Sequence, residues 1–269
     1  MSVMEDRGVA PGVMYDALGS TYAWTRTADR TLVSELVRLL APSMDGVYLD
    51  LGCGTGSYTA ALADIAGGWH GLDRSEVMLR QARARAPRIA WRIGCAERMP
   101  YEDETFDGIV CLNAIHFMQL GETLGELRRV LRSRGRLVIF TMFSEQLERY
   151  WLREYFPRMM AAAAASMPRA SALLAALADA GFQASVSHYH VTRDLTDLFL
   201  YCGKERPELY FDPNVRRNIS QFARFCSEDE LASGLRRLER DMRERSFPPP
   251  GFGRASPEGD CAYVTATKD

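Results

Sequence analysis

The chain has 269 residues, of which 47% are hydrophobic and 25% are charged. This is the composition of an ordinary folded protein, so disorder as the main state is excluded. Its 33 basic and 35 acidic residues give a formal net charge of -2, which does not indicate a bulk electrostatic affinity for nucleic acid. The 6 cysteines are widely spaced, with no C-x-x-C pair. This pattern favours free thiols in a reducing compartment over disulfides or a metal site.

Two segments bear on targeting. The first ten residues include Glu5, Asp6 and Arg7 and contain no apolar core of a secretory signal. The longest apolar run, at 159–167, stops at Pro168 and is too short to span a bilayer. These observations predict a cytoplasmic protein without membrane insertion.

Apolar residues alternate between helical and strand spacing along most of the chain. Helices are predicted over 28–40, 58–66, 75–86, 124–131, 171–180 and 228–245, and strands over 47–51, 69–72, 89–93, 106–112, 136–141, 183–190 and 263–267. Strands that alternate with helices in this way predict an α/β fold. We expect a doubly wound, mostly parallel, seven-stranded Rossmann-like sheet with a helical cap inserted before the last strand.

The spacing also predicts a domain organisation. Residues 1–42 are expected to form N-terminal lid helices, residues 43–191 and 260–269 the core, and residues 192–259 a cap that recognises the substrate. Roughly 70 residues separate the last two strands, far more than a hairpin needs. Within this insertion, Ser227 and Glu230 predict a capping box at the start of helix 228–245.

A glycine-rich turn, GCGTG at 52–56, follows the first strand and opens a helix. A Walker phosphate loop would need a lysine at the helix start, so that class is rejected. A dinucleotide fingerprint would place Gly or Ala where Ser57 stands, and the charge of Asp50 would repel a pyrophosphate. Asp50 instead suits a cationic ligand, and Asp73, about 20 residues past the turn, is placed to bind both hydroxyls of a ribose. A helix cap is the alternative role for each acid; together they favour a nucleoside with a positively charged amino-acid tail.

Five motifs, in this order, resemble those of class I S-adenosylmethionine-dependent methyltransferases, in the subgroup similar to the ubiquinone and menaquinone biosynthesis methyltransferases (methyltransferase type 11). They are DLGCGTG at 50–56, GLDRSEVM at 71–78, GCAERMPY at 94–101, FDGIV at 106–110 and LRRVLRSRGRL at 127–137. The resemblance covers residues 15–142. It implies S-adenosyl-L-methionine as cofactor and S-adenosyl-L-homocysteine as product.

The resemblance also implies a set of cofactor-binding residues, in which the glycine turn contacts the methionine part and the ribose, Asp73 binds the ribose, and Asn113 lies near the methionine part. The full set is Tyr22, Arg26, Asp50, Gly52, Cys53, Gly54, Asp73, Arg74, Met78, Cys95, Ala96, Glu97 and Asn113. Arg26 resembles a lid arginine that meets the cofactor carboxylate; a solvated arginine at a helix end is the alternative. Cys95 stands where the family usually has Asp, and a thiol is a weak acceptor for the adenine amino group.

Methyl transfer from a sulfonium is an in-line displacement that needs no metal, so the enzyme mainly positions the acceptor and excludes water. A general base assists if the acceptor is a hydroxyl or an acidic carbon. His116 follows the fourth predicted strand, on the expected ligand edge, and is the candidate catalytic residue, as a base or as an acceptor-orienting group. A neutral structural histidine is the alternative.

Aromatic residues of the lid, the edge loops and the cap are candidates for the walls of an apolar acceptor pocket, and packing in the core is their alternative role. The substrate-binding candidates are Tyr15, Phe117, Phe143, Tyr201 and Phe222.

The leading hypothesis is methyl transfer to an O, C or N atom of a small, apolar or cyclic metabolite. The alternative is a non-methylating enzyme of the cyclase type that retains the cofactor. A binding module is disfavoured because the turn, both acids and a dedicated cap are all present. RNA methylation would predict a basic face. We expect a small-molecule partner and no nucleic acid, and a homodimer is left open.

Overall fold

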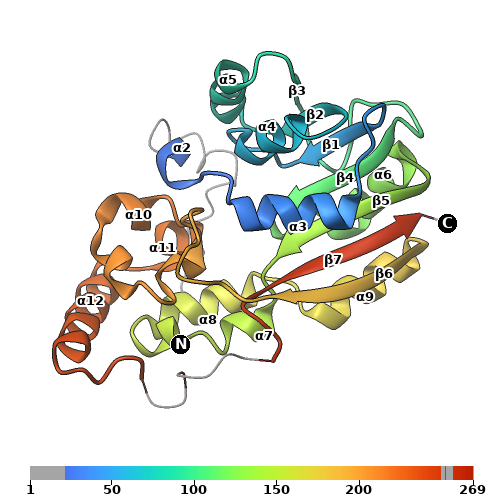
Figure 1. The fold of residues 1–269 in the computed structure, drawn as a ribbon. Coiled ribbons are helices and arrows are strands. Elements are labelled where there is room, and N and C mark those ends of the chain that lie inside the picture. Colours follow the sequence, from blue (N-terminus) through green and yellow to red (C-terminus); the bar gives the residue numbers. More distant parts are fainter. Residues whose placement is uncertain (1–21, 250–251, 253–256, 269) are drawn as a thin grey trace.

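A single seven-stranded sheet organises the protein, whose computed structural model describes residues 22–249, 252 and 257–268 (Figure 1). Its strands lie in the order β3-β2-β1-β4-β5-β7-β6. Their bounds are β1 (Val47–Leu51), β2 (Gly68–Asp73), β3 (Ala90–Ile93), β4 (Phe106–Leu112), β5 (Leu131–Thr141), β6 (Phe182–Tyr189) and β7 (Cys261–Lys268). Neighbouring strands from β3 to β5 are parallel, whereas β7 runs antiparallel to both β5 and β6. The predicted α/β, mostly parallel, Rossmann-like sheet is confirmed.

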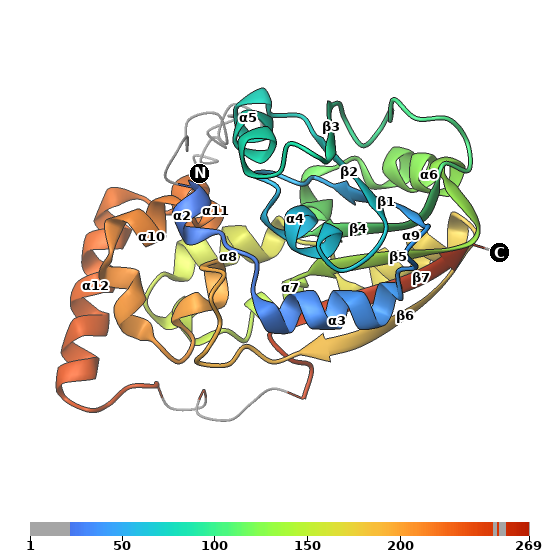
Figure 2. The ribbon, with the colours of Figure 1, turned by 45° about the horizontal axis from the view of Figure 1, so that its top comes forward.

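Helices cover both faces of the sheet, so its central strands are buried on both sides. Side chains alternate between faces along a strand. Val138 and Phe140 of β5 therefore pack with α3 (Arg30–Leu40) and α4 (Ser57–Ala63), and Leu137 and Ile139 pack with α6 (Leu120–Val130) and α9 (Ala170–Asp179). Figures 1 and 2 show α3 on one face and α9 on the other. The remaining core helix is α5 (Glu76–Arg85), and the short helix α2 (Tyr22–Thr25) precedes α3.

Strand β5 begins earlier than predicted, at Leu131 rather than at residue 136. The sequence analysis extended the preceding helix to 131, but α6 ends at Val130 and the strand follows at once. Pairing with β4 is irregular at this end, and Arg134 has a φ of 63°. The sequence analysis did not detect the first part of the strand, because the polar residues there interrupt the apolar pattern of a strand.

The cap is built from two segments of the chain rather than from the predicted insertion alone. The insertion forms the 3-10 helices η4 (Leu200–Gly203) and η5 (Pro207–Phe211) and the helices α10 (Pro213–Arg217), α11 (Ser220–Phe225) and α12 (Glu228–Arg243). An earlier segment, within the range that we assigned to the core, forms α7 (Ser144–Leu147), η3 (Trp151–Glu154) and α8 (Pro157–Ala165). Helix α8 packs against α11, so both segments form one lobe beside the sheet (Figure 2).

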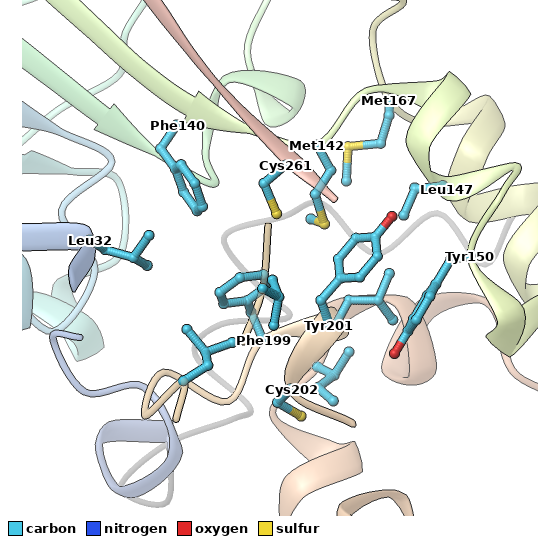
Figure 3. Packing of buried hydrophobic residues seen from close by; sticks show 14 of the residues in the cluster. Leu32, Phe140, Met142, Leu147, Tyr150, Met167, Phe199, Tyr201, Cys202 and Cys261 are labelled. Carbon is cyan, nitrogen blue, oxygen red and sulfur yellow. The ribbon is translucent and has the colours of Figure 1, made fainter. Parts of the chain in front are cut away.

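One hydrophobic cluster joins the cap to the sheet. Figure 3 shows Phe140 of β5, Leu32 of α3 and Tyr201 of the cap within this cluster, all of them buried. The Tyr150 and Tyr210 hydroxyls form a hydrogen bond of 2.6 Å inside it. Because the cap shares its core with the sheet, it is a layer of the same domain.

By length and composition alone, the span Pro157–Asp179 is apolar enough to cross a membrane. In the fold this span is two helices, α8 and α9, which are interrupted around Pro168. Met159 and Ala163 of α8 are buried in the cap cluster, and Leu173 and Leu177 of α9 are buried against the sheet.

The predicted capping box at α12 forms only in part. The Ser227 hydroxyl accepts a hydrogen bond from the Glu230 amide, as expected. The Glu230 carboxylate does not reach back to Ser227; it accepts hydrogen bonds from the amides of Arg158 (2.7 Å) and Met159 (3.2 Å) at the start of α8. Glu230 is buried and caps the other helix, because the two helix starts face each other across the cap.

Glu230→Ala is expected to destabilise the protein by about 1–3 kcal/mol, because it leaves two amides of a helix start without their charged acceptor. Chemical denaturation monitored by circular dichroism measures this loss. Glu239→Ala is the matched control on the same helix, because Glu239 is exposed and pairs with exposed Arg243; it should cost less than about 0.5 kcal/mol. Equal losses in the two variants would contradict this role.

Candidate functional site

The predicted ligand edge contains a pocket at the carboxyl ends of β1, β2 and β4. Its empty space, with the open mouth included, is about 730 Å³. Nine of the predicted cofactor-binding residues line it: Arg26, Gly52, Gly54, Asp73, Arg74, Met78, Cys95, Ala96 and Asn113. Phe117, a predicted substrate-binding residue, lines it as well.

The glycine turn forms the floor of this pocket. Gly52 and Gly54 have positive φ values, of 74° and 52°, which favour glycine. The Gly52 amide donates to the Leu72 carbonyl (2.8 Å), and the Gly54 amide donates to the Asp73 carboxylate (2.8 Å). A pyrophosphate would need such amides as its own donors, so the dinucleotide alternative loses support. A side chain at Gly54 would point into open space, which leaves this part of the floor accessible.

Asp73 ends β2 and lines the pocket. One carboxylate oxygen accepts from the Gly54 amide and the other from the Ser75 amide (2.9 Å). Burial raises the pKa of Asp73, and these hydrogen bonds oppose that rise. A carboxylate has further acceptor capacity beyond two bonds, so Asp73 can hold the turn and still accept from ribose hydroxyls.

Asp50 lies in a smaller pocket beside the first, together with Cys53. Its carboxylate is buried and accepts a 2.5 Å hydrogen bond from the Thr59 hydroxyl. Burial raises the pKa of Asp50 to about 7, with Thr59 opposing and Asp73 adding to the rise. Burial also raises the pKa of the Cys53 thiol. A cation in this region would stabilise the Asp50 carboxylate.

Arg26 lines both pockets and is held by Asp197, a cap residue that the sequence analysis missed. Arg26 donates from Nε (2.6 Å) and Nη2 (3.3 Å) to the two oxygens of the fully buried Asp197 carboxylate. The Tyr58 hydroxyl donates to the same carboxylate at 3.1 Å. The bidentate pair fixes the guanidinium plane at the pocket wall. The signal in the sequence was an acid within the apolar run 195–200, because a carboxylate in such a run needs a buried partner.

Two of the three residues predicted to lie beside the adenine line the main pocket. Cys95 and Ala96 line the main pocket, whereas Glu97 lies next to them and is absent from its lining. Glu97 accepts from the Gln119 amide (2.9 Å) and lies 3.6 Å from the Arg74 guanidinium. Burial acts to raise the pKa of Glu97, but the amide hydrogen bonds and the charge of Arg74 outweigh it and lower the pKa.

Asn113 connects the main pocket to another one under the cap, because it lines both. Its φ is 51°, in the left-handed region that Asn tolerates better than most residues. Its side-chain oxygen is buried and has no hydrogen-bond partner among the described residues. An unpaired buried acceptor costs free energy, so this oxygen is suited to a ligand donor.

His116 lines the pocket under the cap, and both of its ring nitrogens are buried with no hydrogen-bond partner in the part of the chain that the structure describes. Burial and the charge of Arg224 lower its pKa to about 3. The imidazole is therefore neutral at physiological pH, with one donor and one acceptor available.

The other predicted residues lie elsewhere. Phe143 and Tyr201 are buried in the two hydrophobic clusters and are absent from the lining of these three pockets, which matches their alternative role in the core. Phe222 packs against Phe156 and Tyr210 in the same way. Tyr15 and the side chain of Tyr22 lie outside the described residues. Within the described ranges, no three His, Cys, Asp or Glu side chains are grouped to hold a metal ion.

The fold and the pocket define a class. A seven-stranded sheet with β7 antiparallel between β5 and β6, and a pocket behind a glycine turn after β1, is the architecture of class I methyltransferases. The family profile of the methyltransferase domain matches residues 49–139, so this segment of the chain is a methyltransferase domain.

Two curated relatives illustrate the sequence similarity. An uncharacterized methyltransferase of Mycobacterium tuberculosis is 32% identical over 121 residues, which cover 45% of this chain. The match spans about half of that relative, 49% of its length. A demethylmenaquinone methyltransferase of Tropheryma whipplei is 32% identical over 162 residues, covering 54% of this chain and 66% of the relative. The resemblance to the menaquinone biosynthesis subgroup is confirmed.

Solved structures resemble more of the chain. A protein of Anabaena variabilis is described as a methyltransferase from an antibiotic biosynthesis pathway. It is 29% identical to this chain with a TM-score of 0.82, and the match covers 91% of this chain and 100% of that one. The cyclase SpnF has a TM-score of 0.59 at 18% identity, covering 96% of this chain and 95% of its own. At that identity the likeness shows a shared fold alone.

The buried His116 is expected to make the protein less stable as the pH falls. Its pKa is about 3 in the folded state and about 6.5 in an unfolded chain, so between these values the unfolded state binds the proton and the folded state does not. This group is neutral in both states above about pH 6.5, and below it stability falls by up to about 1.4 kcal/mol per pH unit. Guanidinium unfolding of wild type and His116→Gln between pH 5 and 8 measures the difference in slope.

His190→Gln is the control, because His190 is exposed; this variant should keep the wild-type slope. An unchanged slope in His116→Gln would show that the imidazole is not buried.

Proposed function

We propose that this protein is an S-adenosylmethionine-dependent methyltransferase that acts on a small, apolar or cyclic metabolite. The observation that carries the proposal is that one pocket contains both the Asp73 carboxylate and the Asn113 oxygen, which has no hydrogen-bond partner among the described residues. The Gly52 and Gly54 amides of the turn below already donate hydrogen bonds within the protein. Such a pocket offers hydrogen-bond acceptors, and these two amides are not available to bind an anion. It suits a nucleoside with a cationic tail better than a pyrophosphate.

The residues present fit this cofactor. Asp73 would accept from the ribose hydroxyls, and the open space at Gly54 would admit the amino-acid part. The Asn113 oxygen would accept from the ammonium group, and the Asp50 carboxylate would stabilise positive charge nearby. When bound, the cofactor supplies an electrophilic methyl group on a sulfonium.

The remaining chemistry belongs to the chain. The acceptor pocket under the cap meets the cofactor pocket at Arg26 and Asn113, so these residues would hold an acceptor next to the bound cofactor. His116 would hydrogen-bond the acceptor. A pKa near 3 disfavours an imidazolium, so His116 would orient the acceptor by a hydrogen bond and would not take up its proton.

The cysteines support the proposed cytoplasmic location. All 6 are free thiols, and Cys111, Cys202 and Cys261 are buried. Free thiols persist in a reducing compartment.

Calorimetry with S-adenosylmethionine tests the proposal. We expect binding to wild type and a loss of affinity of at least about tenfold in Asp73→Asn, which weakens the acceptor for the ribose and the anchor of the turn. Asp64→Asn is the matched control, because Asp64 is exposed and pairs with exposed Arg88; its affinity should equal that of wild type.

The product separates the two enzyme classes. Release of S-adenosylhomocysteine with an acceptor would support methyl transfer, whereas conversion of a substrate with the cofactor retained unchanged would support the cyclase alternative. Absence of binding to wild type would contradict both.

Cofactor affinity is expected to rise with pH up to about 7. The Asp50 carboxyl is protonated below its pKa of about 7, and a bound cation favours the carboxylate, so binding releases a proton in this range. The affinity should increase by up to about tenfold per pH unit between pH 5.5 and 7 and then level off. Asp50→Asn should remove this dependence. Equal slopes for the variant and wild type would contradict the role of Asp50.

A further inference from the structure

The pocket under the cap has an apolar side and a polar side. It measures about 290 Å³ with its mouth. The apolar side consists of Met142, Phe199, Leu200 and Ile219, all of them buried. The polar side includes Asn113 and His116, whose orphaned atoms have no partner within the described part of the chain, together with Ser220 and Gln221 of α11. A ligand of this pocket therefore needs a compact apolar body and hydrogen-bonding groups.

Arg224 lies on the same side of α11 as these polar residues. It follows Gln221 by three residues and Ser220 by four, so the three side chains share one face of the helix. Its guanidinium carbon lies 5.5 Å from the centre of the Phe117 ring, which lines the cofactor pocket. Its charge is also close enough to His116 to lower the pKa of that imidazole. Arg224 therefore lies beside residues of both pockets, next to Phe117 and near His116, without lining either pocket itself.

This arginine has no acidic partner within the described ranges. Its contacts there are the rings of Phe117 and Phe225, the latter at 4.6 Å, and it is half-buried. The two arginines that line these pockets both have an acidic partner: Arg26 pairs with Asp197, and Arg74 lies 3.6 Å from Glu97. A half-buried guanidinium over two aromatic rings has lost part of its hydration and gains more from an anion than an exposed one does.

We propose that the acceptor is an organic anion and that Arg224 is the residue that selects it. This inference rests on the proposed function. The anionic group, a carboxylate or a phosphate, pairs with the Arg224 guanidinium. The apolar body fills the side formed by Met142, Phe199, Leu200 and Ile219, and the reacting atom faces Asn113 and the cofactor pocket. His116 hydrogen-bonds the acceptor between these ends.

The test compares matched acids and neutral analogues on protein loaded with S-adenosylhomocysteine. The probes are 4-hydroxybenzoate, 4-hydroxycinnamate and phenyl phosphate, against methyl 4-hydroxybenzoate, methyl 4-hydroxycinnamate and phenol, measured by calorimetry. Wild type should bind at least one acid roughly ten- to hundredfold more tightly than its neutral analogue. Carboxylate and phosphate probes show which anionic group is preferred.

Variants of Arg224 test whether this residue causes the preference for the acid. Arg224→Gln should remove the preference for the acid while the neutral analogue binds as before, and Arg224→Lys should restore part of it. A merely structural role would weaken acid and neutral analogue alike. Arg243→Gln is the matched control, because Arg243 is exposed on α12; it should keep the wild-type preference.

Two failures are distinguishable. If wild type does not bind S-adenosylhomocysteine, the proposed function fails. If it binds the cofactor product but shows no preference for any acid over its neutral analogue, including the case in which no acid binds, the anion inference is overturned while the proposed function stands. Retention of the preference in Arg224→Gln would also overturn it.

Discussion

The hydrogen bonds between the glycine turn and the end of β2 are the constraint on which the site depends. The Gly52 amide is fixed to the Leu72 carbonyl and the Gly54 amide to the Asp73 carboxylate. These bonds hold the turn in a conformation with positive φ, which glycine adopts at little cost. They also place Asp73 at the pocket edge and leave the space above Gly54 open. The same bonds that shape the floor therefore decide which kind of ligand it can accept.

The pair between Arg26 and Asp197 links this floor to the cap. Asp197 takes two bonds from Arg26 and one from Tyr58, and the Leu198 amide donates to the Thr25 carbonyl at 2.8 Å. The segment before α3 and the start of the insertion are thus joined at the wall shared by the pockets. Because the cap also shares a hydrophobic cluster with the sheet, packing positions the pocket under the cap relative to the main pocket.

The sequence predicted features whose causes are local. The order of strands and helices follows from apolar periodicity, and the positions of Gly54 and Asp73 follow from the turn and the strand end that carry them. Features set by distant partners could not be predicted: Asp197 lies 171 residues from Arg26, and Glu230 caps α8 instead of its own helix. Phe143 and Tyr201 were candidates for the pocket wall but lie in the core, because aromatic spacing alone does not tell which side faces a ligand.

A crystal structure of the protein with S-adenosylhomocysteine tests the central claim most directly. We predict that the ribose hydroxyls lie within hydrogen-bonding distance of the Asp73 carboxylate, with the amino-acid part above Gly54 and its ammonium near the Asn113 oxygen. A ligand bound elsewhere, or a pocket that stays empty at saturating concentrations of the ligand, would contradict the account.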